Sequence, residues 1–271
     1  MIRTGVSGFG GRMGTSIARL ILESSDMVLG GAMEDKAHPA IGRDAAEALG
    51  YPRCGAVVSS GINDAFDACD LIIDFTQPEA TLQTALYASG RGKPLVIGTT
   101  GFSAEQKEKI ASCAVHIPIM LSPNMSIGVN VLFKVVGMMA RLLDESYDVE
   151  IVETHHRLKK DAPSGTALAL AQAVAKARGV DLEERACFSR HGIIGRRPLG
   201  EIGIQAVRAG DIVGEHTVMF AGTGERIEIT HKAHSRENFA QGALAAARWM
   251  VGRQPGLYSM MDVLGIRDEV R

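Results

Sequence analysis

Residues 155–166 place two imidazoles and two ammonium groups immediately ahead of a predicted helix. Imidazole can accept or donate a proton near neutral pH, and lysine supplies positive charge. The helix begins at Ser164-Gly165-Thr166, where backbone N–H groups without helical partners attract anions. These residue types in this order predict a site for a small, doubly anionic substrate that is protonated as it reacts.

A glycine-rich loop near the start of the chain predicts a dinucleotide site. The apolar stretch Ile2–Ser7 is followed by Gly8-Phe9-Gly10-Gly11-Arg12-Met13-Gly14 and then by a helical pattern. Small residues between a strand and a helix let the backbone close on a pyrophosphate at the helix N-terminus. A second predicted strand, residues 27–32, leads to Glu34, which is placed to bind ribose hydroxyls. The alternative interpretation is a glycine turn followed by a solvated acid.

Strand and helix patterns alternate as far as about residue 122, which predicts a parallel sheet covered by helices. Helices begin at Pro78 and after Ser103, whose side chain is predicted to form a capping box with Gln106. Ligands bind beyond the carboxyl ends of the strands in such sheets. Two further polar loops are therefore candidate nicotinamide contacts, with ordinary turns as the alternative. Their residues are Gly98, Thr99 and Thr100, and Ser122, Pro123, Asn124 and Met125.

The pattern changes after residue 126, which predicts a second domain. Residues 127–143 form a predicted helix that is apolar on most faces, so we expect it to be buried. A predicted strand then leads to His155 and His156, and a helix runs from Ser164 to a stop at Gly179. Three later strands, the last two joined at residues 222–224, predict a mixed and largely antiparallel sheet. Ser235 is the predicted cap of a closing helix.

Composition excludes several classes of protein. The 271 residues favour about two domains, and 46% hydrophobic residues predict packed cores. A net charge of −2 provides no basic surface for nucleic acid. The absence of an apolar run of 18 residues or a signal sequence predicts no membrane association. The four cysteines are scattered, so we expect buried thiols in a reducing cytoplasm, with no disulfide and no metal site.

The whole chain resembles the dihydrodipicolinate reductases of bacterial and plant lysine synthesis. The resemblance rests on the glycine loop, on Asp74-Phe75-Thr76, on residues 98–102, on residues 153–166 and on residues 208–216. The stretch Lys-x-Asp-Ala-Pro-Ser-Gly-Thr within residues 159–166 is specific to that family, whereas the glycine loop is not.

The resemblance implies the reduction of 4-hydroxy-tetrahydrodipicolinate to tetrahydrodipicolinate by NADH or NADPH. The implied fold class is α/β, with a Rossmann-like parallel sheet domain and an α+β domain containing a mixed sheet. Residues 1–126 with 237–271 would bind the dinucleotide. Residues 127–236 would bind the small dicarboxylate substrate and build a homotetramer.

Site roles also follow from the resemblance. His155 would be the acid or base and Lys159 the proton donor beside it, while Lys160 is expected to be solvated. The substrate would be bound by His156, Ser164, Gly165 and Thr166. The dinucleotide would be bound by the two polar loops above and by Gly8, Phe9, Gly10, Gly11, Arg12, Met13, Glu34 and Asp35.

Asp35 determines the predicted cofactor preference. Family members that use NADPH well often carry a basic residue directly after the acid that binds ribose, and here that position is Asp35. Two adjacent carboxylates repel a 2′-phosphate, so we expect both cofactors to be used with NADH favoured. Lys36 and Arg12 are cations that could oppose this preference.

Three alternatives remain open from the sequence. The first is another small amino-acid dehydrogenase on the same two-domain plan. The second is an inactive nucleotide sensor, against which the complete motif at residues 159–166 argues. The third is a metal hydrolase built on His155, His156, His191 and the cysteines, although no metal-ligand spacing supports it.

Overall fold

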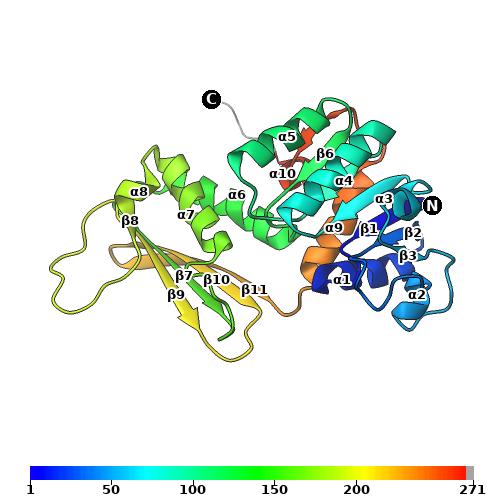
Figure 1. The fold of residues 1–271 in the computed structure, drawn as a ribbon. Helices are drawn as coiled ribbons and strands as arrows, with labels where there is room; N and C mark the ends of the chain where they lie inside the picture. The colour runs from blue at the N-terminus through cyan, green and yellow to red at the C-terminus, as the bar shows by residue number, and fades with distance from the viewer. Residues whose placement is uncertain (267–271) are drawn as a thin grey trace. The chain divides into compact units, whose positions relative to one another are not determined.

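A parallel sheet of seven strands forms the centre of the unit that contains the N-terminus (Figure 1). The computed structural model describes residues 1–266, and this unit comprises Met1–Ile127 together with the chain from Arg236 onward. The strands, in spatial order, are β12 (Gly256–Tyr258), β6 (Pro118–Leu121), β5 (Leu95–Ile97), β4 (Leu71–Asp74), β1 (Ile2–Ser7), β2 (Met27–Met33) and β3 (Val58–Ser59).

Helices cover both faces of this sheet, as the alternating pattern predicts. One apolar core lies against α1 (Arg12–Leu22) and α9 (Glu237–Met250). A second core lies against α3 (Ile62–Phe66), α4 (Pro78–Arg91) and α5 (Ala104–Ala114). Short helices α2 (Ala45–Ala48) and α10 (Met260–Val263) complete the unit. The strand order reverses between β1 and β4, where a ligand crevice is expected at the carboxyl ends of the strands.

The second unit, Gly128–Ser235, is built on a five-stranded mixed sheet. Its strands, in spatial order, are β11 (Glu225–Ala233), β10 (Gly214–Gly222), β7 (Asp148–His155), β9 (Ile202–Arg208) and β8 (Ala186–Cys187). Its helices are α6 (Ile127–Leu142), α7 (Gly165–Arg178) and α8 (Leu182–Arg185). Val149 and Ile151 of β7 pack with α6 and α7 in its core. These units confirm the predicted fold class.

Local sequence signals account for several helix ends. Ser103 and Gln106 form the predicted capping box, Pro78 opens α4, and Ser164 caps α7 by accepting the Ala167 N–H. Gly179 ends α7 in the left-handed conformation that favours glycine.

Three sequence predictions about the second half were wrong in detail. The sheet has two antiparallel and two parallel strand pairs, so it is mixed but not largely antiparallel. Helix α6 is not buried on most faces, because Val131, Met138 and Leu142 are 42%, 45% and 75% exposed. The closing helix begins at Glu237, and its N-cap position is Arg236, one residue after the predicted Ser235.

The unit boundaries fall one residue from the predicted domain boundaries, and residues 267–271 of the predicted dinucleotide domain lie outside the described residues. None of the helices within residues 1–266 is both long enough and apolar enough to cross a membrane.

Candidate active site

The glycine loop joins β1 to α1 in a turn that tolerates no side chains at two of its glycines. Gly8 has a φ of +80°, which disfavours other residues. A Cβ on Gly14 would lie 2.0 Å from the Gly8 carbonyl oxygen. The Gly11 N–H donates to that same oxygen over 3.0 Å. The sequence Gly8–Gly14 therefore closes a tight strand–loop–helix turn.

Helix α1 presents its N-terminus without a competing side chain. Its N-cap is Gly11, which makes no side-chain capping bond, and no acidic residue lies in its first turn. The first N–H groups of a helix lack helical partners and carry partial positive charge. This helix start therefore suits a pyrophosphate, and the loop geometry fits a dinucleotide.

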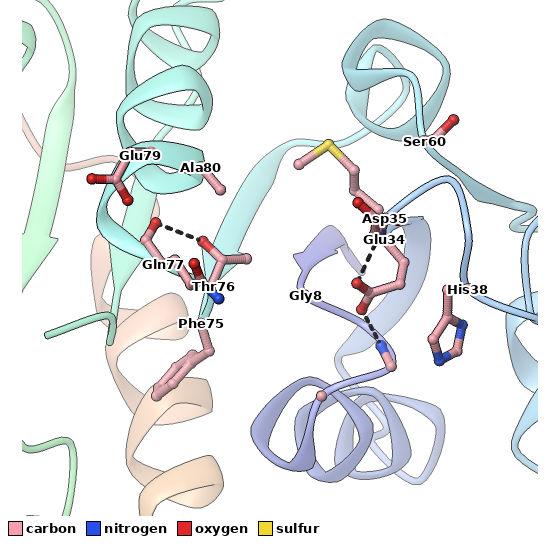
Figure 2. A pocket seen from close by; sticks show the side chains of 13 residues that line it. Gly8, Glu34, Asp35, His38, Ser60, Phe75, Thr76, Gln77, Glu79 and Ala80 are labelled. Atoms are coloured by element: carbon pink, nitrogen blue, oxygen red, sulfur yellow. Dashed lines mark hydrogen bonds between the residues drawn. The ribbon is translucent and has the colours of Figure 1, made fainter.

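A cavity of about 690 Å³ opens beside this loop at the carboxyl ends of β1, β2 and β4. Figure 2 shows the residues of the β4–α4 connection on one side and Glu34 and His38 on the other. Five predicted cofactor residues line it, namely Gly8, Gly10, Gly11, Glu34 and Asp35. The lining also includes Met33, His38, Ser60, Phe75, Thr76, Gln77, Glu79 and Ala80, which were not predicted as site residues.

The Glu34 carboxylate is held at the entrance of the glycine loop. One oxygen accepts the Gly10 N–H over 2.6 Å, and the other accepts the Asp35 N–H over 2.9 Å (Figure 2). His38 packs against Gly10, where a Cβ would lie 2.3 Å from its Nε2 atom. The acid is therefore fixed beside the loop and lines the cavity.

The other predicted cofactor residues do not line this cavity. Phe9 and Met125 are 1% and 2% exposed as whole residues and lie in the core, so neither presents a side chain to a ligand. Thr99 accepts the N–H of Thr76 over 2.9 Å, and Thr76 lines the cavity, so Thr99 holds part of the cavity wall in place. The other predicted cofactor residues that do not line the cavity are Arg12, Met13, Gly98, Thr100, Ser122, Pro123 and Asn124.

In the second unit, the end of β7 carries a buried carboxylate next to the first histidine. Glu153 is 0% exposed. One of its oxygens lies 2.6 Å from His155 Nδ1, and the other accepts the Ser164 N–H over 2.9 Å. Arg208 of β9 donates to both oxygens, over 2.7 and 2.8 Å. The carboxylate thus joins His155 to the start of α7.

Burial and hydrogen bonds set the protonation of this cluster. Burial alone would raise the pKa of Glu153, but hydrogen bonds from Arg208, His155 and the Ser164 N–H outweigh it and lower that pKa. Burial lowers the pKa of His155, and the bond to Glu153 offsets this only in part. Glu153 is therefore charged and His155 is neutral at neutral pH.

Lys159 is connected to the same cluster through Asp161. Its Nζ atom lies 2.8 and 2.9 Å from the two Asp161 carboxylate oxygens, and Arg208 donates to the Asp161 carbonyl over 2.7 Å. Lys160 is exposed, as predicted. His156 lies beyond the end of β7, and its buried Nδ1 atom has no hydrogen-bond partner among residues 1–266.

The start of α7 supplies the third part of the cluster. Gly165 is exposed at the first helical position, and the first turn carries no acidic residue. Ser164 Oγ contacts His216 Nε2 over 3.0 Å, and the pKa of His216 is lowered to about 4, chiefly by burial. A neutral histidine therefore contacts the serine that caps α7. The start of this helix remains suited to bind a carboxylate.

Sequence reasoning assigned no role to Glu153, Arg208 or His216, although all three lie within the stretches that carry the family resemblance. A signal existed for Glu153: it lies two residues before His155 on a strand, so both side chains share one face. Within residues 1–266, no group of three or more His, Cys, Asp or Glu side chains is arranged to hold a metal ion.

Comparison with known proteins gives one consistent result. Residues 2–125 match the family model described as dihydrodipicolinate reductase, N-terminus, and residues 128–264 match that described as dihydrodipicolinate reductase, C-terminus. A 4-hydroxy-tetrahydrodipicolinate reductase from Syntrophobacter fumaroxidans is 55% identical, covering 98% of this chain and 100% of its own. The enzyme of the same name from Syntrophus aciditrophicus is 52% identical with the same coverage.

One solved structure shares the fold across both units. It is described as dipicolinate-bound dihydrodipicolinate reductase from Paenisporosarcina sp. TG-14, and it matches with a TM-score of 0.78 at 24% identity. The match covers 97% of this chain and 98% of the other.

Proposed function

The chain belongs to the dihydrodipicolinate reductase family, and we propose that its Gly128–Ser235 unit binds the substrate while the unit with the glycine loop binds the dinucleotide. The reaction is the reduction of 4-hydroxy-tetrahydrodipicolinate to tetrahydrodipicolinate with NADH or NADPH, in lysine and diaminopimelate biosynthesis. The chain is therefore an oxidoreductase.

The observation that carries the proposed site is the set of contacts around Glu153. This carboxylate binds His155, Arg208 and the Ser164 N–H, and Arg208 in turn binds the Asp161 carbonyl next to Lys159. A proton-transfer group, a cation and a helix start are thereby held together. A ring with two carboxylates requires this combination, because it needs anion binding and proton transfer in one place.

The residues of this cluster divide the work. Gly165 and Thr166 at the start of α7, with His156, bind the substrate carboxylates through N–H, hydroxyl and imidazole groups. Ser164 was predicted to share this role, but its N–H donates to Glu153 and its hydroxyl contacts the Ala167 N–H and His216, so it supports the helix start as a buried cap. Lys159 donates the proton that meets the negative charge developing toward the ring nitrogen. His155 acts as acid or base next to it. General acid–base assistance of this kind is worth about 100- to 10,000-fold in rate.

The other unit holds the dinucleotide, which supplies the hydride from its reduced nicotinamide. We assign the pyrophosphate to the N–H groups at the start of α1 and the adenosine ribose to Glu34. The candidate nicotinamide contacts are Gly98, Thr99, Thr100, Ser122, Pro123, Asn124 and Met125. They stand at the carboxyl ends of β5 and β6.

NADH is the preferred cofactor in this account. Asp35 lines the cavity next to Glu34, whereas Lys36 and Arg12 do not. A 2′-phosphate placed at the ribose would therefore meet two carboxylates.

We further infer a homotetramer that acts in the cytoplasm. Strand β11 is one of the two edge strands of its sheet, and none of its residues is buried. Val207 of β9 and Ile227 of β11 are 43% and 38% exposed. An open edge and apolar sheet residues suit pairing between copies of this chain. Analytical ultracentrifugation distinguishes a tetramer from a monomer.

Dipicolinate provides the test of the substrate site. The solved relative is described with this dicarboxylate bound. We expect dipicolinate to inhibit competitively against the substrate. We expect Thr166→Val to weaken this inhibition and to raise the KM for the substrate without raising the KM for NADH. Inhibition competitive with NADH alone would contradict the proposed division between the units.

A further inference from the structure

We propose that Glu153 is a positioning residue: its carboxylate fixes His155 with the proton on Nδ1 and leaves Nε2 to exchange the proton with the substrate, while Arg208 compensates the carboxylate charge. This inference deepens the proposed function and rests on it for the role of His155. Glu153 itself is too buried to touch the substrate.

The carboxylate has no unused hydrogen-bonding capacity toward water. Each oxygen accepts one bond from Arg208, and the remaining two bonds come from His155 Nδ1 and the Ser164 N–H. A charged group in this position is stable only when paired and fully bonded. The Glu153 carboxylate is therefore held in a fixed position by residues of β7, β9 and the start of α7.

The contact with Glu153 determines the tautomer of His155. A carboxylate paired with arginine only accepts hydrogen bonds, so the imidazole nitrogen 2.6 Å from it carries the hydrogen. The other nitrogen, Nε2, faces Gly214 of β10, where an added Cβ would lie only 2.9 Å away. Glycine at this position leaves room beside the nitrogen that must act.

The charges facing His155 explain why the carboxylate orients the ring without making it a permanent cation. They are Glu153 on β7, Arg208 on β9, Lys159 in the following loop, and the neutral His216 on β10, whose ring centroid lies 5.2 Å from that of His155. Arg208 cancels Glu153, and Lys159 adds a further positive charge. The net effect, together with burial, is a lowered pKa of His155.

Two substitutions are therefore expected to move the titration of His155 in opposite directions. Glu153→Gln removes the carboxylate that favours the imidazolium form of His155, so the midpoint of its titration falls by about one pH unit. Arg208→Met removes a cation and leaves the carboxylate unpaired, so the midpoint rises. Glu150→Gln is the matched control, because Glu150 lies on the opposite face of β7 and pairs with Arg190 and Arg197.

The titration is measured by NMR on the full chain with ¹⁵N-labelled histidine, and His155→Asn identifies the signal. We expect the Nδ1–H tautomer in wild type at alkaline pH and opposite shifts of the midpoint in the two variants. We also expect kcat/KM to fall about 10-fold or more in Glu153→Gln but not in Glu150→Gln. Thermal unfolding shows whether each variant is folded.

An Nε2–H tautomer in wild type would overturn the proposal. So would an unchanged midpoint in folded Glu153→Gln or Arg208→Met, or an equal loss of kcat/KM in Glu150→Gln. Because the NMR measurement needs no substrate, it stands apart from the proposed function. A wild type with the expected titration but no reductase activity would contradict the proposed function alone.

Discussion

Lys159 Nζ lies within 2.9 Å of both carboxylate oxygens of Asp161. The lysine is thus bound by an anion of the chain itself, in the loop between β7 and α7. A substrate carboxylate presents the same chemical group, so the position of Lys159 is already one that suits an anionic ligand.

Lys159→Ala is expected to lower kcat by about 100-fold or more, because it removes both a proton donor and a cation that faces substrate charge. The matched control is Lys160→Ala, which removes an exposed lysine of the same loop. Steady-state kinetics with saturating NADH checks both variants. Equal activity of the two variants would refute the assignment of Lys159.

His155→Ala is expected to lower kcat while leaving the dissociation constant for NADH close to that of wild type. The reason is that His155 and the glycine loop belong to different units of the chain. Turnover and fluorescence titration with NADH check the two halves of this prediction. Weakened NADH binding with a wild-type kcat would contradict the role assigned to His155.

Asp35→Arg is expected to shift the ratio of kcat/KM for NADPH over NADH upward by about 10-fold or more, most clearly at low salt. The substitution replaces a repelling carboxylate in the cavity with a group that pairs with phosphate. Lys36→Ala is the control, because Lys36 does not line the cavity. A wild type that strongly favours NADPH, with the preference lost in Lys36→Ala, would show that Lys36 outweighs the acidic pair.

Gly14→Ala is expected to destabilise the protein by about 1–3 kcal/mol and to weaken dinucleotide binding. Its Cβ would lie 2.0 Å from the Gly8 carbonyl oxygen, so the loop must move. Gly90→Ala in α4 is the control, since the added Cβ would meet no atom within 4 Å apart from the adjacent helix backbone, and alanine favours a helix by about 0.5–1 kcal/mol. Urea unfolding and NADH titration measure both effects. Wild-type behaviour of Gly14→Ala would contradict the loop geometry.

The sequence predicts most of the fold because its signals are local. The glycine loop, the capping box at Ser103 and the stop at Gly179 each act within a few residues, and the structure confirms these helix ends. The predicted burial of α6 failed because apolar composition does not reveal which faces are covered. Val131 and Leu142 are exposed although their side chains are apolar.

The two sites differ in how far the sequence reveals them. Gly10 and Glu34 could be predicted as site residues because each comes shortly after a predicted strand, and both line the cavity. His38 and Ser60 reach the same cavity from loops whose course depends on tertiary packing, and no motif marks them. Arg208 meets Glu153 only because β9 pairs with β7 in parallel, a register that the sequence does not specify.

The most direct measurement of the central claim is a coupled assay with the full chain. Dihydrodipicolinate synthase, pyruvate and aspartate semialdehyde generate the substrate, and either reduced cofactor is then added. The account predicts substrate-dependent oxidation of both cofactors, faster with NADH, and near-complete loss in Lys159→Ala. No cofactor oxidation by folded wild-type protein, with either NADH or NADPH, would contradict it.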